Sequence, residues 1–304
     1  MSIETSRTVP PPGPHGGDGP AIAAALGLDP STVLDLSQTL NPFAPDVAAI
    51  AARHLDTLGT YPDRREATER LAAELGIDAD RLLLTNGGSE AIRLVAAELG
   101  GSVVSEPEFG LHPRSSGAVR WRSDPHSPSG LLARPGDEAD VWDEAFYALT
   151  TGRWTARRPG TVTVGSLTKL FACPGLRLGY VIADDVDRFA RHQPGWPVSS
   201  LALAVLPQLL AAADLPGWAA SITSTRARTA AVLARHGLHP QPSDAPWLLV
   251  RAPGLRERLA PSGVIVRDCA SFGLPGVTRV AVVDGPELDR LDRALHRSAP
   301  LELP

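Results

Sequence analysis

Hydrophobic and polar positions follow two different periods along the chain, and the changes of period mark out its elements. Short apolar runs rich in aliphatic and β-branched residues predict buried strands at the start of 81–99, at 141–143, at 161–165 and at 178–183. After a Gly-Gly turn, residues 89–99 carry apolar side chains at helical spacing. Strands and helices alternate in this way from about residue 64 to residue 183. The pattern therefore predicts an α/β fold with a mostly parallel sheet covered by helices.

The last third of the chain has a different pattern. Residues 198–236 predict two helices rich in alanine and leucine, with the break between them at Pro216-Gly217. Further on, the sequence predicts strands at 247–250, 264–266 and 277–283, and an amphipathic helix at 287–297. The first 20 residues, rich in proline and glycine, predict an arm. We therefore expect an N-terminal arm (1–42), a large domain (43–195), and interdomain helices followed by a smaller α+β domain (196–304).

Composition and charge exclude several classes of protein. The 304 residues carry a formal net charge of -5, and the basic residues are scattered, which argues against nucleic-acid binding. No apolar run approaches the roughly 20 residues of a membrane span, and the first 20 residues lack the apolar core of a signal peptide. The two cysteines lie in no CxxC pair and near no paired histidine, so neither a disulfide framework nor a metal site is expected. We expect a cytoplasmic protein.

Lys169 is the only lysine of the chain, beside 28 arginines. Arginine serves as well as lysine at an ordinary surface position, but its guanidinium stays protonated at any usable pH. Lysine is required where an amine has to lose its proton and attack an aldehyde carbon to form an imine. We therefore predict that Lys169 is a catalytic nucleophile. The alternative is a surface lysine that by chance has not been replaced by arginine during evolution.

The residues around Lys169 point to a phosphate. Ser166 and Thr168 precede the lysine, Arg177 follows it, and all four lie between two predicted strands. Two hydroxyls and a guanidinium near one amine suit a phosphate that is attached to an aldehyde. Pyridoxal 5′-phosphate carries both groups.

Two further segments offer support for the same cofactor. Gly88 and Ser89 open a predicted helix, where free backbone N–H groups bind phosphate, although a Gly-Gly turn often only caps a helix. Asp143 ends a short predicted strand. A carboxylate there can pair with the protonated pyridine nitrogen and so make the ring an electron sink. For Asp143, an exposed loop acid is the alternative.

These segments resemble the fold-type I pyridoxal-phosphate enzymes of the class I/II aminotransferase superfamily. The resemblance covers nearly the whole chain and is carried by HGGD (15–18), LDLSQTLNPFAP (34–45), YPD (61–63), NGGSEAI (86–92), PEF (107–109), DEAF (143–146), SLTKLFACPGLRLGY (166–180), GWPVSSLA (195–202), VIVRDCASFGL (264–274) and TRVAVV (278–283). The lysine motif is the most specific of these. The resemblance implies a mostly parallel central sheet between helices, and a smaller α+β C-terminal domain.

Position by position, the resemblance implies a role for each matching residue. It makes Lys169 and Asp143 the catalytic residues, and Phe109 the aromatic residue that stacks on the cofactor ring. It also implies a homodimer with shared active sites, because Tyr61 would reach the cofactor phosphate in the partner subunit. The cofactor phosphate would be held by Gly88, Ser89, Ser166, Thr168 and Arg177. The substrate, a small phosphorylated amino acid or amine, would be bound by Arg279 at its carboxylate, by Arg267 near its distal end, and by His15 and Asn41 on the arm.

The chain departs from the family pattern at four places. DPHSPSG stands in place of NPNNPTG, so Ser127 replaces an asparagine that bonds the ring hydroxyl of the cofactor. Phe146 replaces the usual tyrosine for the same oxygen. Gly130 and Asp143 are only 13 positions apart, where relatives carry a helix and a strand, and Val283 stands where a second arginine is common. These changes bear on the electronics of the ring and on substrate binding.

Within the superfamily, HGG, DEAF, WPV and RDC are most similar to the L-threonine-O-3-phosphate decarboxylases of cobalamin biosynthesis. That resemblance implies decarboxylation of L-threonine O-3-phosphate to (R)-1-aminopropan-2-yl phosphate. An aminotransferase of the histidinol-phosphate type shares every cofactor residue, and the short segment 130–143 leaves a non-catalytic homologue open as well. A nicotinamide-dependent dehydrogenase would need GxGxxG after the first strand, which NGGSEA does not supply.

Overall fold

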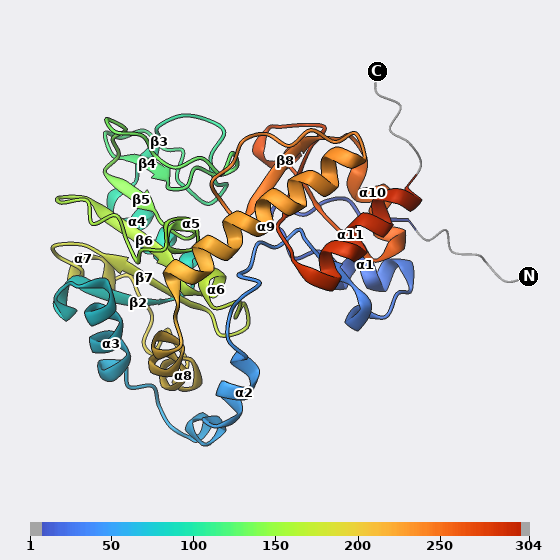
Figure 1. Ribbon diagram of the computed structural model, residues 1–304. Helices are drawn as coiled ribbons and strands as arrows, with labels where there is room; N and C mark the ends of the chain where they lie inside the picture. Colours follow the sequence, from blue (N-terminus) through green and yellow to red (C-terminus); the bar gives the residue numbers. More distant parts are fainter. Residues whose placement is uncertain (1–7, 299–304) are drawn as a thin grey trace, which may run out of the picture. The chain divides into compact units, whose positions relative to one another are not determined.

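Six strands of the segment Leu40–Ile222 form one sheet in the computed structural model, which describes residues 8–298 of the chain (Figure 1). Their order is β2 (Leu82–Asn86), β7 (Leu178–Ile182), β6 (Val162–Ser166), β5 (Val141–Asp143), β4 (Arg120–Ser123) and β3 (Ser102–Val103). Strand β7 runs antiparallel to both of its neighbours, and the other five strands are parallel to one another. The predicted strands and the mostly parallel sheet are thereby confirmed.

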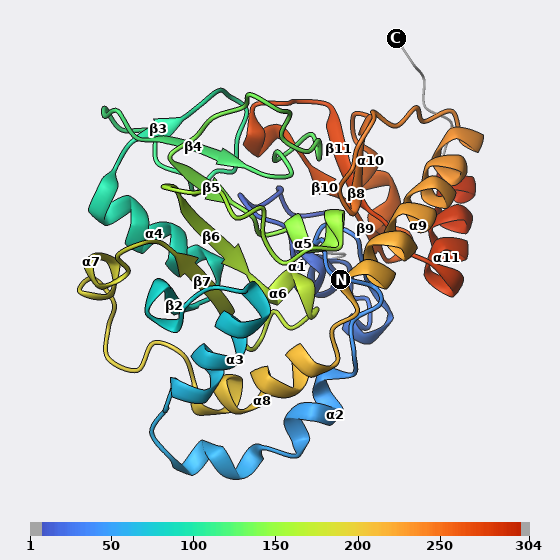
Figure 2. The ribbon, with the colours of Figure 1, turned by 60° about the vertical axis from the view of Figure 1, so that its left-hand side comes forward.

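Buried aliphatic side chains explain why these segments form the middle of a sheet. Strands β6 and β7 are buried along their whole length, as expected where helices cover a parallel sheet. Helix α4 (Gly88–Leu99) packs across β2, β6 and β7, and its Ile92 and Val95 join Val164 and Val181 in one core. Helices α3 (Arg65–Leu75) and α8 (Ser200–Ala211) pack against each other (Figure 2). The other helices of this unit are α2 (Val47–Ala52), α5 (Tyr147–Thr151), α6 (Leu167–Leu170) and α7 (Asp187–Ala190).

A second sheet lies in the unit formed by the described parts of Met1–Thr39 and Thr223–Pro304. Its three antiparallel strands follow the order β10 (Arg267–Asp268), β11 (Val277–Ala281) and β8 (Trp247–Arg251). Helices α9 (Leu215–Arg235) and α11 (Gly285–Arg297) lie side by side (Figure 2), and Leu233 and Leu291 pack with Val250 and Val280 of the sheet. The predicted strands and the amphipathic last helix are confirmed.

The N-terminal residues belong to this second unit. Strand β1 (Leu34–Asp35) pairs in parallel with β9 (Val264–Ile265), which follows α10 (Leu255–Leu259). Helix α1 (Gly19–Leu26) buries Ile22 against Ile265. Residues 1–7 of the predicted arm lie outside the described residues. The predicted domain boundaries, 1–42, 43–195 and 196–304, stay a prediction.

The predicted position of the break in 198–236 is wrong. The two helices are separated by residues 212–214, and Pro216 and Gly217 lie in the first turn of α9. Proline is accepted there because the first N–H groups of a helix have no intrahelical partner. The Asp214 carboxylate accepts a hydrogen bond from the Gly217 N–H (3.0 Å) and so helps to start the second helix.

No single helix in the described part of the chain is long and apolar enough to cross a membrane. Helices α8 and α9 pass such a test only when they are taken together, across a bend of 82°. Helix α8 buries Leu203, Leu206 and Leu209.

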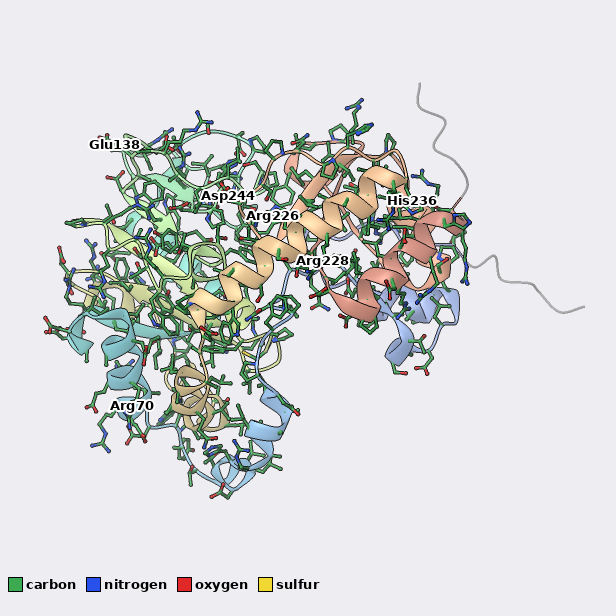
Figure 3. All side chains as sticks on the ribbon, viewed as in Figure 1. Arg70, Glu138, Arg226, Arg228, His236 and Asp244 are labelled. Carbon is green, nitrogen blue, oxygen red and sulfur yellow. The ribbon has the colours of Figure 1, made fainter. Side chains whose placement is uncertain are left out.

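The connection between β4 and β5 has no helix, although the two strands are parallel. Parallel neighbours are usually joined by a crossover helix that covers the sheet; here they are joined by an irregular loop that includes Glu138 (Figure 3). Arg158 covers part of this face, because its guanidinium lies 3.8 Å from the centre of the Trp142 ring. The same guanidinium bonds the carboxylates of Asp124, after β4, and Glu144, after β5. One arginine therefore ties together two strand ends beside the predicted site.

Candidate active site

Lys169 lies in α6, a single helical turn that follows β6 directly. Its side chain is half-buried. Asn41 supports this turn, because its N–H donates to the Lys169 carbonyl (3.0 Å) and its Nδ2 donates to the Leu170 carbonyl (2.9 Å). Its Oδ1 accepts a hydrogen bond from the Phe43 N–H (3.0 Å). Asn41 is thus a buried support of the lysine turn, and its predicted contact with the substrate stays a prediction.

The N-terminus of α4 opens onto the guanidinium of Arg177. Gly87 precedes the helix with a φ of 77°, and a Cβ at Gly87 would lie 2.6 Å from Arg177 Nη2. A Cβ at Gly179 would overlap the peptide between Gly87 and Gly88. Arg177 has a φ of 57°, in the left-handed region that non-glycine residues rarely adopt. The backbone thus holds a cation beside the unpaired N–H groups of a helix start, which is an arrangement that binds phosphate.

The two hydroxyls that the sequence assigns to the phosphate differ in their surroundings. Ser166 ends β6, and its Cβ lies 3.2 Å from the position that a Cβ on Gly88 would take, so Ser166 faces the start of α4. Thr168 is buried, and its hydroxyl donates to the Leu178 carbonyl (3.3 Å). Ser89 is exposed in the first turn of α4. Binding of the phosphate by Ser89 and Thr168 stays a prediction.

Asp143 ends β5, and both oxygens of its buried carboxylate are engaged. Oδ1 accepts a hydrogen bond from the Ala145 N–H (2.9 Å), and Oδ2 lies 3.0 Å from His112 Nε2. The sheet places Asp143 beside β6, since it pairs with Val164, two residues before Ser166. Asp143 is therefore not the exposed loop acid that the sequence left open.

His112 and Glu108 lie behind Asp143, and sequence reasoning missed both. The buried imidazole stands between two carboxylates, because His112 Nδ1 lies 3.5 Å from Glu108 Oε2. Burial lowers the pKa of His112, but the contacts with Asp143 and Glu108 outweigh it and raise that pKa to about 9. The sign of this pair in the sequence was that Glu108 and His112 are four residues apart. Nothing there linked it to Asp143, 31 residues after His112.

Two further predicted cofactor residues come from segments that contact Asp143 or its histidine. Phe109 is half-buried and meets His112 edge to face, with 5.7 Å between the ring centres. Ser127 is buried in the loop after β4, and this loop is fixed to β5 because the Asp124 N–H donates to the Asp143 carbonyl (2.8 Å). Stacking by Phe109 and bonding of the ring hydroxyl by Ser127 stay predictions.

In the other unit, two buried arginines are cross-strand partners. Arg267 of β10 pairs with Arg279 of β11, and their guanidinium groups lie over the rings of Phe272 (4.5 Å) and Trp247 (5.3 Å). Among residues 8–298, no carboxylate lies within ion-pair distance of either arginine, and both Nε atoms lack a hydrogen-bond partner. Burial and then the charge of Arg267 lower the pKa of Arg279 to about 9. Two adjacent buried cations are unfavourable unless an anion binds them.

The N-terminal HGGD turn reaches Arg267 in the same unit. Arg267 Nη2 donates to the Pro14 carbonyl (3.0 Å), and His15 follows with an exposed side chain. His15 and Arg267 are therefore close in space although they lie 252 positions apart in the sequence, because Arg267 bonds the residue just before His15.

A comparison with family models decides what kind of site this is. Residues 140–297, just over half of the 304-residue chain, match the model for aminotransferases of class I and II. The chain belongs to this family. The matched part includes Asp143, Lys169, Arg177 and both buried arginines. Pyridoxal 5′-phosphate is the cofactor of the family and of this enzyme.

Family members with two different activities match almost the whole chain. A histidinol-phosphate aminotransferase of Dechloromonas aromatica is 24% identical over 339 residues, which cover 91% of this chain and 93% of that protein. A threonine-phosphate decarboxylase of Salmonella typhimurium is 29% identical over 351 residues, which cover 93% of this chain and 95% of that protein. The solved histidinol-phosphate aminotransferase of Sinorhizobium meliloti, in complex with pyridoxal-5′-phosphate, has a TM-score of 0.76 and 17% identity, over 91% of this chain and 93% of that one. The fold-type I architecture is thereby confirmed.

The residues of this family member fit pyridoxal phosphate at both of its ends. At the phosphate end, the start of α4, Ser166 and Arg177 form a cradle that a Cβ on Gly87 would fill. At the ring end, Asp143 presents a buried carboxylate held in place by two contacts. Lys169 follows Ser166 by three residues, on the helical turn that comes directly after β6.

A group of exposed apolar side chains lies near Tyr61, the residue that the family pattern assigns to the partner subunit. Tyr61 is 79% exposed and stacks on Trp196, which is 64% exposed, with 4.7 Å between the ring centres. Leu55 and Leu58 are exposed as well. Trp196 has a φ of 49° and lines a cavity of about 490 Å³ together with Pro62. Exposed apolar groups of this kind mark interaction surfaces.

Proposed function

We propose that this enzyme decarboxylates L-threonine O-3-phosphate to (R)-1-aminopropan-2-yl phosphate, a step of cobalamin biosynthesis. The observation that carries the proposal is the pair of adjacent buried arginines, Arg267 and Arg279, without a carboxylate partner among residues 8–298. A substrate with a carboxylate and a phosphate supplies one anion for each guanidinium. Histidinol phosphate carries a phosphate but no carboxylate. The Salmonella typhimurium relative, whose name states the decarboxylase activity, supports the same substrate.

Each arginine has a separate task in this proposal. Arg279 binds the α-carboxylate of the substrate, and Arg267 binds the phosphate at the distal end with help from His15. Guanidinium groups suit both anions because their N–H groups form two parallel hydrogen bonds to paired oxygens. Burial strengthens these bonds, since the charges interact in a medium of low dielectric constant.

The residues of the larger unit hold the cofactor and so promote cleavage of the bond between the substrate Cα and its carboxylate. Bound pyridoxal phosphate supplies an electron sink for the electrons left at the substrate Cα. Asp143 keeps a proton on the ring nitrogen, and Gly88, Ser166 and Arg177 hold the phosphate. Lys169 would hold the cofactor covalently, and its free amine would deliver the proton that takes the place of CO2 at Cα of the substrate.

Decarboxylation and transamination differ in which bond to the substrate Cα breaks. Arg279 would decide between them by the orientation in which it holds the carboxylate: one orientation would favour loss of CO2, and the other loss of a proton. Such positioning alters barriers by several kcal/mol. A histidinol-phosphate aminotransferase is the second candidate, because the Dechloromonas aromatica relative has that name and a 2-oxo acid co-substrate also brings a carboxylate.

We also propose that the enzyme is a homodimer with shared sites. The exposed pair of Tyr61 and Trp196 supports this proposal, since a stacked pair of large rings in water is unfavourable unless another surface covers it. In the dimer, the Tyr61 hydroxyl of one subunit donates to the cofactor phosphate of the other. The small phosphorylated substrate is then the only other partner that the site requires.

One pair of assays tests the proposed reaction. The purified enzyme with its cofactor is given L-threonine O-3-phosphate, and CO2 release is measured. In parallel it is given histidinol phosphate and a 2-oxo acid, and amino-group transfer is measured. Release of CO2 without transfer supports the decarboxylase, whereas transfer without CO2 release rejects it in favour of the aminotransferase.

A further inference from the structure

We infer that Glu108 is a positioning residue of the cofactor site: its charge keeps His112 protonated, and His112 in turn holds the Asp143 side chain in a fixed orientation. The inference rests on the proposed role of Asp143 as the partner of the cofactor ring. Glu108 contacts the Asp143 carboxylate through the imidazole, and it also bonds Ser123, the strand partner of Asp143, so it acts at one remove from the cofactor.

The surroundings of Glu108 favour its ionised form. The side chain is 2% exposed, and both oxygens accept hydrogen bonds. Oε1 accepts from the Ser123 N–H (2.6 Å), and Oε2 accepts from the Ser123 hydroxyl (2.5 Å) and the Phe109 N–H (2.8 Å). Two of the three donors are backbone N–H groups, which cannot accept a proton in return. Burial raises the pKa of Glu108, but the contacts with His112 and Ser123 outweigh it and hold that pKa below its usual value.

His112 is enclosed between the two carboxylates. Its Nε2 lies 3.0 Å from Asp143 Oδ2, and its Nδ1, which makes no hydrogen bond, lies at ion-pair distance (3.5 Å) from Glu108 Oε2. The other neighbours are the ring of Trp121, 5.6 Å away between centres, and the ring of Phe109. Both rings are neutral. The imidazole is therefore the positive group between two buried negative groups.

One cation also lies next to this group, on the same segment as His112. Arg114 Nη1 donates to the backbone carbonyl of His112 (2.6 Å). Arg114 forms an ion pair with the exposed carboxylate of Glu106. The negative charge of Glu106 largely offsets the effect of the Arg114 charge on the imidazole. Among the described residues, Asp143 and Glu108 are the charged groups that face the imidazole nitrogens.

A neutral imidazole cannot satisfy both carboxylates. With its proton on Nε2, the lone pair of Nδ1 faces the charge of Glu108; with its proton on Nδ1, the lone pair of Nε2 faces the charge of Asp143. Either form places a lone pair against a negative charge in a medium of low dielectric constant, where that repulsion is strong. The imidazolium alone directs an N–H toward each carboxylate.

The protonated imidazole fixes the carboxylate on which the proposed site depends. Asp143 then receives one N–H from His112 and one from Ala145, so its plane is set before any cofactor binds. If Glu108 lost its charge, the imidazole would lose one of the two groups that keep it protonated.

Glu108 also connects the segment before His112 to the end of β4 through Ser123. The experiment therefore has to distinguish a purely structural role of Glu108 from an electrostatic one. The variant Ser123→Ala removes the hydroxyl that donates to Glu108 but keeps the carboxylate and its charge. The variant Glu108→Gln keeps the size of the side chain but removes the charge. A comparison of the two variants separates the bond from the charge.

The experiment follows the titration of His112 itself. The enzyme with its cofactor, labelled with 15N at its eight histidines, is titrated by NMR from about pH 5.5 to about pH 10, and His112→Asn identifies the resonance of His112. We expect the pKa of His112 to lie near 9 in the wild type and in Ser123→Ala. In Glu108→Gln we expect it to fall toward the ordinary value of about 6.5.

Two results overturn the inference. The first is a wild-type His112 that is already neutral at about pH 7.5, which needs no variant and so holds even if Glu108→Gln fails to fold. The second is an equal change, or no change, in the two variants. Neither result depends on the reaction catalysed: a protein that binds no cofactor or releases no CO2 would reject the proposed function, while the titration of His112 could still be read.

Discussion

Arg267 and Arg279 are buried partners on two antiparallel strands, and among the described residues no carboxylate forms an ion pair with either of them. Each side chain lies over an aromatic ring, which accepts a cation but does not neutralise it. The charge of Arg267 adds to burial in lowering the pKa of Arg279. This arrangement lowers the stability of the free enzyme and favours a bound anion, as expected of a site built for binding rather than for folding.

The variant Arg279→Gln should therefore separate binding from stability. We expect KM for L-threonine O-3-phosphate to rise about 100-fold, because a charge-assisted pair of hydrogen bonds is lost. The free energy of unfolding should stay the same or rise by about 1 kcal/mol, because one of two adjacent like charges is removed. Steady-state kinetics and urea unfolding measure the two effects.

Arg228→Gln is the matched control for that variant. Arg228 projects from α9 (Figure 3) and pairs with Asp284 at the surface of the same unit (2.6 Å). Its loss should leave KM unchanged and alter the free energy of unfolding by less than about 1 kcal/mol. A large loss of stability in Arg279→Gln with an unchanged KM would show that Arg279 is structural.

The variant Lys169→Arg should abolish the covalent link to the cofactor without unfolding the enzyme. Guanidinium stays protonated and cannot attack the aldehyde, but it fills the half-buried position of the amine. The wild-type enzyme should be yellow and lose its colour on reduction with borohydride, and the variant should release its cofactor on gel filtration. A wild-type protein that stays colourless after soaking with the cofactor would reject the assignment of Lys169.

The variant Asp143→Asn should still bind the cofactor but lose turnover. The amide cannot keep the ring nitrogen protonated, so the electron sink fails, and we expect kcat to fall at least about 100-fold. Cofactor absorbance and fluorescence titration measure binding, and CO2 release measures turnover. Turnover equal to that of the wild type would mean that the buried carboxylate serves only to hold the loop at Ala145.

The pKa of His112 makes a prediction about stability as a function of pH. That pKa is raised in the folded state to about 9 from an ordinary value of 6.5, so its contribution is complete below pH 6.5 and is lost as the pH rises toward 9. We expect the free energy of unfolding of the wild type to fall by up to about 3 kcal/mol over this range. The fall should be smaller in Glu108→Gln than in Ser123→Ala. Urea unfolding at pH 6.5 and pH 9 measures both, and equal falls in the two variants would contradict the electrostatic role.

The strand that ends at Asp143 and the strand that precedes the Lys169 turn could be predicted because their side chains are buried on both faces, which leaves a continuous apolar run in the sequence. The chemistry of Lys169 could be predicted from its isolation among arginines. Pro216 misled the prediction of the helix break, because proline is a helix breaker only beyond the first turn.

The contacts of His112 could not be predicted, because they depend on how the segment between β3 and β4 returns to the end of β5. The register of the strands could not be predicted either, because Arg267 and Arg279 become partners only through the pairing of two short antiparallel strands. Asn41 was assigned to the substrate, and its hydrogen bonds to the lysine turn come from tertiary packing over 129 residues. In each case the residue type was visible in the sequence, but its partner was not.

The proposed homodimer makes a prediction that concerns Tyr61. This residue and Trp196 form an exposed stacked pair, and Trp196 is held in the left-handed region of the backbone. If the Tyr61 hydroxyl binds the cofactor phosphate of the other subunit, cofactor binding favours the dimer by mass action. Analytical ultracentrifugation at micromolar concentration should then show a dimer that the cofactor strengthens. The interface should be isologous, with each Tyr61 serving the opposite site.

A mixture of two inactive variants tests whether the sites are shared. In a heterodimer of Lys169→Ala and Tyr61→Ala subunits, one site lacks both residues, because it contains the altered lysine and receives the altered tyrosine. The other site has both residues intact, so co-expression should restore activity to about half of the wild-type value in each heterodimer. If Tyr61 served the site of its own subunit, each site would keep one defect and no activity would return. Leu58→Ala alters an exposed apolar side chain near Tyr61 and serves as the control for loss of surface area, which should weaken the dimer without changing the pattern of recovery.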